Sequence, residues 1–263
     1  MIGLKTKILN ELCRRWHYFK LPLDKSHPLT LSELRQSGLD RTSQYIYCDY
    51  YFRHFLPEQI KKHRQYFIQD QRGFGEDAFH AMWFILLQEL KPKKALEIGV
   101  YRGQTITLWK LISSVLKFEC AVSCISPFSS TGDSVSNYKN GIDYFEDTKT
   151  NHNYFNLPMP EVCRCLSTEP QAVEFIKSKK WDLIYIDGNH EYEVVTKDWQ
   201  VCIESVEKGG IIVLDDSALY TDYKPPRFAT AGHPGPSRVA NDIPKDNFIE
   251  LFNAGHNRVF QKI

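Results

Sequence analysis

Three aspartates stand directly after two apolar segments, in positions where they could bind a metal ion. Asp187 follows the run 182–186 (DLIYI), and Asp215 and Asp216 follow the run 210–214 (GIIVL). Such runs are typical of buried parallel strands, whose carboxyl ends share the edge of a sheet where ligands bind. Carboxylates gathered there repel one another unless a cation neutralises them, and an all-oxygen ligand set suits Mg²⁺. A single aspartate at such a position is more often a cap of the next segment.

A glycine turn with an acid at its start, EIGVYRG at 97–103, lies between a short apolar run and a helical segment. Gly99 permits a sharp turn, and Gly103 lets the helix approach the strand. The spacing differs from the G-x-G-x-x-G pattern that grips a dinucleotide. Glu97 suits a cofactor that carries an ammonium group, such as S-adenosyl-L-methionine. Glycine turns of this kind also occur in many other α/β proteins, so the turn alone does not identify the cofactor.

Four segments together resemble the class I S-adenosylmethionine-dependent methyltransferases, in particular the macrocin-type and natural-product sugar O-methyltransferase branch. They are ALEIGVYRG (95–103), IDGNHEY (186–192), GGIIVLDD (209–216) and GPSRVANDI (235–243). The resemblance extends from about residue 75 to the C-terminus.

This resemblance implies a set of site residues. It implies that Asp187, Asp215 and Asp216 hold Mg²⁺ and that His190, which is a general base in some relatives, acts with Asp187 in catalysis. A histidine after a strand end can also brace its loop by hydrogen bonding. The residues expected to bind the cofactor are Glu97, Gly99, Tyr101, Gly103, Thr105, Ser126, Ser167 and Asp187.

Ser126 departs from the family pattern. The second strand of the family commonly ends in an acid that bonds the cofactor ribose, whereas this sequence has Ile125-Ser126-Pro127 there. A hydroxyl cannot bond two ribose hydroxyls bidentately. The replacement therefore leaves open a protein that kept the fold without turnover.

Alternating strands and helices would position these residues. Apolar runs predict strands at 95–98, 120–125, 162–166, 182–186, 210–214, 248–252 and 258–263. Helical patterns occur at 78–90, 105–116, 170–177 and 192–206. The order indicates a doubly wound α/β fold, a Rossmann-like methyltransferase with a seven-stranded, mostly parallel sheet and an antiparallel C-terminal strand. The segment 123–160 is expected to be a long loop with a short helix.

The chain divides into an N-terminal, mainly helical extension at 1–72 and a methyltransferase domain at 73–263. Leu4, Ile8, Leu9, Leu12 and Trp16 recur at helical spacing among basic residues. Such a helix can lie on a membrane or grip a partner. We favour packing on its own domain or on a sister subunit, which makes this region a candidate contact of a homo-oligomer.

The amino-acid composition limits the kinds of binding partner to be expected. Lys and Arg number 33 and Asp and Glu 32, so no net basic field attracts nucleic acid, and a small-molecule or glycan acceptor is expected. No run of eighteen apolar residues suggests a membrane span, and no secretory leader is recognised. Seven scattered cysteines are expected to be reduced core thiols of a cytoplasmic protein. Cys163 and Cys165 are too close together for a zinc knuckle.

The function expected is magnesium-assisted methyl transfer from S-adenosylmethionine to a hydroxyl of a sugar or other small polyol. The Pro- and Gly-punctuated segment 217–243 would cover the site as a lid, and His152 and His256 are assigned no role. The alternatives are an N-methyltransferase, a hydroxylase-like relative, or a non-catalytic protein on the same fold. An iron oxygenase typically needs two histidines and a carboxylate, and the sequence near Asp187 offers one histidine.

Overall fold

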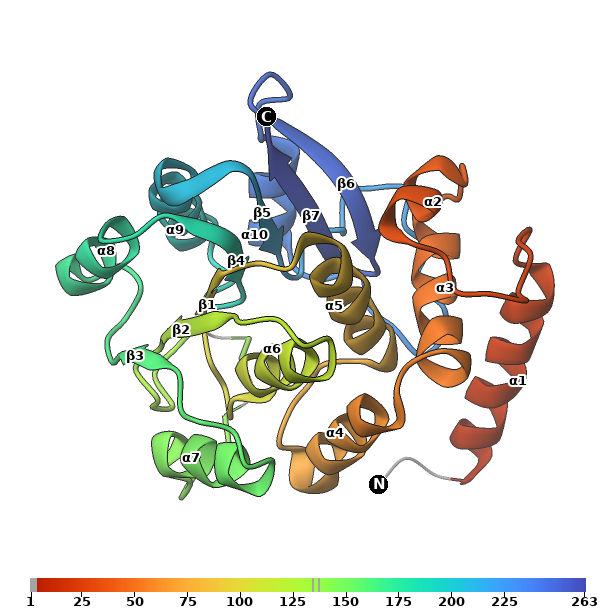
Figure 1. Cartoon of the computed structure of the whole chain (residues 1–263), viewed down its shortest axis with the longest axis horizontal. Helices are drawn as coiled ribbons and strands as arrows, with labels where there is room; N and C mark the ends of the chain where they lie inside the picture. The colour runs from red at the N-terminus through yellow and green to blue at the C-terminus, as the bar shows by residue number, and fades with distance from the viewer. Residues whose placement is uncertain (1–3, 134, 137) are drawn as a thin grey trace.

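A computed structural model describes residues 4–133, 135–136 and 138–263 and contains one mixed sheet (Figure 1). Its strands lie in the order β3-β2-β1-β4-β5-β7-β6; β7 runs antiparallel to β5 and β6, and the other pairs are parallel. Their bounds are β1 Lys94–Ile98, β2 Ala121–Ile125, β3 Glu161–Cys163, β4 Trp181–Ile186, β5 Val206–Leu214, β6 Phe248–Ala254 and β7 Asn257–Lys262. This arrangement confirms the predicted fold class.

Helices precede the sheet and connect its strands. The first group is α1 Leu4–Lys20, α2 Leu31–Gln36, α3 Arg41–His54, α4 Glu58–Ile68, the short 3₁₀ turn η1 Gln69–Gln71 and α5 Asp77–Leu90. The connecting helices are α6 Gln104–Val115, α7 Tyr144–Tyr154, α8 Pro170–Lys177, α9 Tyr192–Ser205 and α10 Pro234–Asn241. The predicted helix within the long loop is thus α7.

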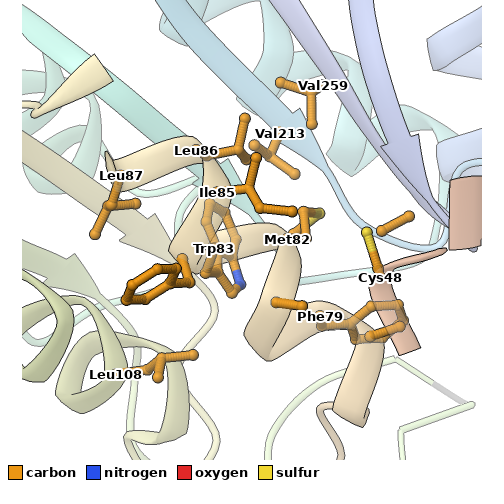
Figure 2. Close-up of a cluster of buried hydrophobic side chains, with 14 of the residues drawn as sticks. Cys48, Phe79, Met82, Trp83, Ile85, Leu86, Leu87, Leu108, Val213 and Val259 are labelled. Atoms are coloured by element: carbon orange, nitrogen blue, oxygen red, sulfur yellow. The ribbon is translucent and has the colours of Figure 1, made fainter. Parts of the chain in front are cut away.

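Alternate residues of the central strands supply two separate cores, because side chains on a strand point to opposite faces. Leu96 and Ile184 belong to the core beneath α8, α9 and α10. Leu183 and Val213 belong to the core beneath α3, α5 and α6. In the second core Leu86 of α5 lies near Val213 of β5 (Figure 2), and Trp83 of the same helix packs edge-on against Tyr185 of β4 at 5.0 Å between ring centroids.

The predicted third strand ends too late in the sequence. β3 pairs with β2 over residues 161–163 only, and the Cys165 amide turns back to donate to the Cys163 carbonyl. At the edge of the sheet no further partner holds the next residues extended. Cys165 is still buried in a core, whereas Leu166 is 42% exposed, and a pattern of hydrophobicity cannot distinguish such residues from a strand.

The N-terminal helices do not stand apart from the sheet. Side chains of α2 and α3 share one core with α5 and the sheet, and Arg41 of α3 pairs with Glu250 of β6. Whether residues 1–72 behave as a unit of their own therefore stays a prediction.

Helix α1 packs in an unusual orientation, beside α3 at the periphery (Figure 1). Its polar face meets the protein, where Arg14 contacts Asp49 at 3.2 Å and Tyr18 donates to the same carboxylate. Its apolar side chains point outward, and no residue of α1 is buried. The expected packing of this stripe on the helix's own domain is therefore not observed.

Within the described residues no helix has the length and apolar composition required to cross a membrane. The seven cysteines are all free thiols, and five of them are buried.

Candidate functional site

A cavity of about 780 Å³ opens at the carboxyl ends of β1, β4 and β5. Every residue predicted for the site lines it. They are Glu97, Gly99, Tyr101, Gly103, Thr105, Ser126, Ser167, Asp187, His190, Asp215 and Asp216. The fold therefore brings together residues that are up to 119 positions apart, from Glu97 to Asp216, at one rim of the sheet.

Glu97 of β1 lines this cavity and is 3% exposed. Its carboxyl accepts hydrogen bonds from Thr105 and from the backbone of Ile106, at the start of α6. Burial outweighs these bonds and raises the pKa of Glu97 to about 8. The buried Oε2 has no hydrogen-bond partner among the described residues. A buried, unpartnered carboxyl oxygen is costly unless a ligand completes it.

The turn after β1 requires glycine at two positions, because a side chain there would collide with other parts of the protein. Gly99 has φ +97°, and a Cβ there would lie 2.0 Å from the carbonyl oxygen of Asp187. Gly103 has φ +82°, and a Cβ there would lie 2.8 Å from a methyl of Thr148. Gly99 thus permits the close approach of the ends of β1 and β4, in addition to the sharp turn that the sequence predicts.

Ser126, which replaces the usual acid, is already engaged. Its hydroxyl donates to the carbonyl of Val100 at 2.9 Å and accepts from the Phe128 amide at 3.2 Å. It therefore ties the end of β2 to the turn after β1. Ser167 is similarly engaged, because its hydroxyl donates to Asp198 at 3.1 Å.

Tyr101 contributes an aromatic wall. Its ring lies 4.9 Å from that of Phe74 and 5.3 Å from that of Tyr144, measured between centroids. Its buried hydroxyl has no hydrogen-bond partner among the described residues. Phe74 is more than half exposed and could cover a ligand that enters beside Tyr101.

Asp187 and Asp215 face each other across the ends of β4 and β5. Burial first, and then the charge of the neighbouring Asp215 carboxylate, raise the pKa of Asp187 well above its usual value. Asp215 also lies 3.4 Å from Nε2 of His256. Two carboxyl groups this close share a proton or require a cation.

Asp216 is the centre of a second, mixed cluster. Its backbone has φ +49°. Its carbonyl accepts a hydrogen bond from the His233 amide at 2.8 Å, and this bond holds His233 next to Asp216. Its Oδ2 lies 2.9 Å from Nε2 of His190 and 3.7 Å from Nε2 of His233, and its Oδ1 lies 3.8 Å from Nε2 of His256. Three imidazoles therefore converge on one carboxylate.

His190 is held from both sides. Its Nδ1 lies 2.6 Å from Oδ2 of Asp133, and the same oxygen accepts from its backbone amide at 2.7 Å. Burial disfavours the imidazolium, but the hydrogen bonds to Asp216 and Asp133 outweigh burial and raise the pKa of His190 to about 9. An unperturbed imidazole titrates near pH ~6.5, and the two carboxylates are the reason for the difference.

Among the described residues, two sets offer ligand atoms within 4.8 Å of one another: His190, Asp216 and His233, and Asp215, Asp216 and His256. Asp187 belongs to neither set. His256, which received no role from the sequence, enters the site from the turn between β6 and β7, and the other histidine left without a role, His152, bonds the Pro158 carbonyl at 3.1 Å.

Asp133 and His233 were also missed, although Asp216 and the glycine turn were found. His233 lies within the predicted lid, directly before α10, and a bridge between Ser217 and Gly232 joins the two ends of the segment that precedes it. No spacing rule connects these positions to Asp216. Only the folded loops place them there.

Comparison with known proteins agrees with this geometry. Residues 96–217 match the sequence model of a family described as a methyltransferase domain. An uncharacterized protein R132 of Acanthamoeba polyphaga mimivirus is 37% identical over 62 residues, which is 24% of this chain and 25% of the viral protein. The match therefore spans a quarter of that protein's length.

Solved structures share the fold. A SAH-bound methyltransferase from Podospora anserina, PaMTH1, has a TM-score of 0.56 and 11% identity, over 92% of this chain and all of the fungal one. A putative caffeoyl-CoA O-methyltransferase from Staphylococcus aureus has a TM-score of 0.56 and 14% identity, covering 81% and 95%. An O-methyltransferase from Bacillus cereus in complex with SAH has a TM-score of 0.54 and 13% identity, covering 83% and 96%. The fold is thus that of the Rossmann-like methyltransferases.

Proposed function

We propose that this protein transfers a methyl group from S-adenosylmethionine to a hydroxyl oxygen of a sugar or another small polyol. The observation that carries the proposal is the unpartnered carboxyl oxygen of Glu97, buried in the wall of a cavity that Asp187, Asp215 and His190 also line. The match of residues 96–217 to a methyltransferase domain supports it.

The residues of the first turn fit the cofactor. Oε2 of Glu97 would accept a hydrogen bond from the methionyl ammonium group, which is a charge-assisted contact. Tyr101 would pack against the cofactor from the opening of the cavity, and Thr105 holds the Glu97 carboxyl in place. Because the hydroxyl of Ser126 is engaged with Val100 and Phe128, recognition of the ribose would depend on other groups of the wall.

The acceptor would lie between the turn and the aspartates. A divalent cation held there would lower the pKa of an acceptor hydroxyl, and Mg²⁺ is the ion that Asp187, Asp215 and Asp216 alone would favour. The donor set only partly fits Mg²⁺, because imidazole nitrogens of His190, His233 and His256 stand among the oxygens. No step is therefore assigned to Mg²⁺.

His190 would accept the proton of the acceptor hydroxyl in its neutral form, which its pKa of about 9 makes the minor form near pH ~7. The hydrogen bond between Nδ1 and Asp133 fixes the orientation of the ring. Nε2 is hydrogen bonded to Asp216, and His190 lines the cavity. This is the arrangement of a general base oriented by a carboxylate. Methyl transfer is an in-line displacement, so the remaining contribution of the protein is to align oxygen, methyl and sulfur in a closed site.

Titration calorimetry with S-adenosylmethionine and S-adenosylhomocysteine tests the proposal before an acceptor is known. We expect one binding site for each, with dissociation constants in the range of roughly 1 μM to 1 mM that is usual for enzyme ligands. Absence of binding by both compounds would refute it. Binding without methyl transfer to any polyol in a panel would instead favour the non-catalytic alternative.

A hydroxylase-like activity is the second candidate, since one observation favours it. His190, Asp216 and His233 offer two imidazoles and one carboxylate, the set typical of non-haem Fe(II) oxygenases. Oxygen consumption by the Fe²⁺-loaded protein in the presence of candidate acceptors, without methyl transfer, would select it.

A further inference from the structure

The two oxygens of the Asp216 carboxylate face different partners. Oδ2 is directed to His190 and His233, whereas Oδ1 lies on the side of His256. Nε2 of His256 is 3.8 Å from this Oδ1 and 3.4 Å from Oδ1 of Asp215. The cluster therefore has a proton-binding side, with His190, and a separate side formed by Asp215, Asp216 and His256.

The separations on the second side match those between ligands of one ion. Ligand atoms about 2.1 Å from a metal lie about 3 Å apart when adjacent and about 4.2 Å apart when opposite. The 3.4 and 3.8 Å distances from His256 fall between these limits. In addition, Oδ1 of Asp215 is buried and has no hydrogen-bond partner among the described residues.

The imidazole of His256 is oriented as a metal ligand would be. Its Nδ1 lies 3.1 Å from the hydroxyl of Thr230 and 3.4 Å from the Thr230 carbonyl, so Nε2 faces the carboxylates. The ring is buried and packs edge-on against Phe79 at 4.7 Å between centroids. A metal-bound histidine usually has its other ring nitrogen bonded in this way, because that bond fixes the tautomer.

We propose that Asp215, Asp216 and His256 bind a divalent first-row transition metal ion of the Mn²⁺, Fe²⁺, Co²⁺ and Zn²⁺ class, in preference to Mg²⁺. Imidazole is a good ligand for these ions, whereas Mg²⁺ takes oxygen ligands and keeps its waters. The inference rests on the proposed function in placing this ion beside the acceptor, but metal binding can be measured without methyl transfer.

The experiment uses the full-length protein, stripped with a chelator and titrated separately with Mn²⁺, Co²⁺ and Mg²⁺. We expect one Mn²⁺ per chain, with nitrogen hyperfine coupling from a bound imidazole in its electron spin echo spectrum. Mg²⁺ should displace Mn²⁺ only at a roughly 100-fold or larger excess. Equal affinity for Mg²⁺, a spectrum without nitrogen coupling, or no bound ion would each overturn the inference.

Two variants locate the ligand. His256→Gln should remove the nitrogen coupling and lower Mn²⁺ affinity by roughly 10-fold or more. His27→Gln, at an exposed histidine outside the cavity, should change neither. Nitrogen coupling that persists in a folded His256→Gln protein would overturn the assignment. The spectrum of the unaltered protein remains a test if that variant does not fold. S-adenosylmethionine binding by the metal-free protein is scored separately, so failure of the metal inference is distinguishable from failure of the proposed function.

Discussion

Nε2 of His190 lies 2.9 Å from Oδ2 of Asp216, so a hydrogen bond joins the proposed base to a proposed metal ligand. A cation on the other oxygen of Asp216 would withdraw negative charge from this bond and make the imidazole easier to deprotonate. The same cation would acidify a bound hydroxyl. Metal binding would therefore favour loss of a proton both from the His190 imidazole, which must be neutral to act as a base, and from the acceptor hydroxyl.

His190→Ala should lower the single-turnover rate of methyl transfer by roughly 10²–10⁴-fold, the usual effect of removing a general base. Affinity for S-adenosylmethionine should stay nearly unchanged, because Glu97 and the glycine turn are intact. Rapid-quench kinetics and calorimetry on the same preparation measure both quantities. His27→Ala, at an exposed position outside the cavity, is the control.

Asp133→Asn separates catalysis from bracing of the loop. The amide can still accept from the His190 backbone but provides no charge to Nδ1, so the rate should fall while cofactor affinity is retained. If both His190→Ala and Asp133→Asn weaken cofactor or metal binding as much as they slow turnover, His190 braces the loop and the base is another group.

Gly99→Ala should destabilise the protein far more than a comparable glycine replacement. Gly141 also has a left-handed backbone, φ +77°, but a Cβ there meets nothing within 4 Å. Gly141→Ala should therefore lower the free energy of unfolding by about 1 kcal/mol, from backbone strain alone. At Gly99 the added methyl would meet the Asp187 carbonyl and cost about 1–3 kcal/mol more. Urea unfolding of both variants measures the difference, and equal losses would contradict a contact between the strand ends.

The sheet was predictable from the sequence because each central strand is a short apolar run bounded by turns. Residues 182–186 and 210–214 have no other way to bury both faces, and their order with the helices determines the parallel arrangement. The boundary of β3 was not predictable, because an edge strand ends where its neighbour stops pairing with it. Of the two predicted partners for the apolar face of α1, its own domain does not cover it and a sister subunit stays a prediction, since periodicity identifies an apolar face but not what covers it.

The site was predictable for residues in the first turn and at or near the carboxyl ends of the strands. Glu97, Asp187 and Asp215 are of this kind, and topology alone brings them to one rim. Asp133, His233 and His256 come from long loops or from a turn at the far end of the chain. A lone histidine in a loop usually has no role, so no local signal distinguished His256 from His152.

The outward apolar face of α1 should mediate self-association. Leu12 and Trp16 are each more than half exposed, although such side chains are usually covered in a monomer. Light scattering should show a mass of at least twice 30.7 kDa, and Leu12→Glu with Trp16→Glu should reduce it to that of a monomer. Lys7→Glu, an exposed charge change on the same helix, is the control. A monomeric unaltered protein would contradict the prediction.

Two buried histidines should make the protein acid-sensitive. Nδ1 of His63 lies 3.1 Å from Nε2 of His80, and burial lowers the pKa of His80 to about 3 and that of His63 well below its usual value. Below about pH 6.5 the unfolded chain binds protons that the folded protein does not, so stability falls by about 1.4 kcal/mol per pH unit for each histidine. Urea unfolding between about pH 6.5 and 5 should show a shallower dependence for His80→Gln than for the unaltered protein or His27→Gln.

Binding of S-adenosylmethionine should release a proton from Glu97. Burial raises the pKa of Glu97 to about 8, so most molecules carry a neutral carboxyl group at pH ~7 before the cofactor binds. A cationic ammonium beside Oε2 favours the carboxylate and lowers this pKa, because an opposite charge stabilises the ionised form. Close to one proton should therefore leave on binding at pH ~7, and the number should decline as the pH rises through about 8.

Calorimetry in two buffers with different ionisation enthalpies counts the protons released. Glu97→Gln preserves the shape of the side chain and removes its charge, so it should abolish the release and weaken binding by about 1.5–3 kcal/mol, the value of a hydrogen bond to a charged group. 5′-Methylthioadenosine lacks the amino acid portion of the cofactor, and it should bind both proteins equally without releasing a proton. If the unaltered protein releases no proton with S-adenosylmethionine, or if Glu97→Gln weakens both ligands alike, the ammonium group does not lie against Glu97. The cofactor would then be held in another orientation.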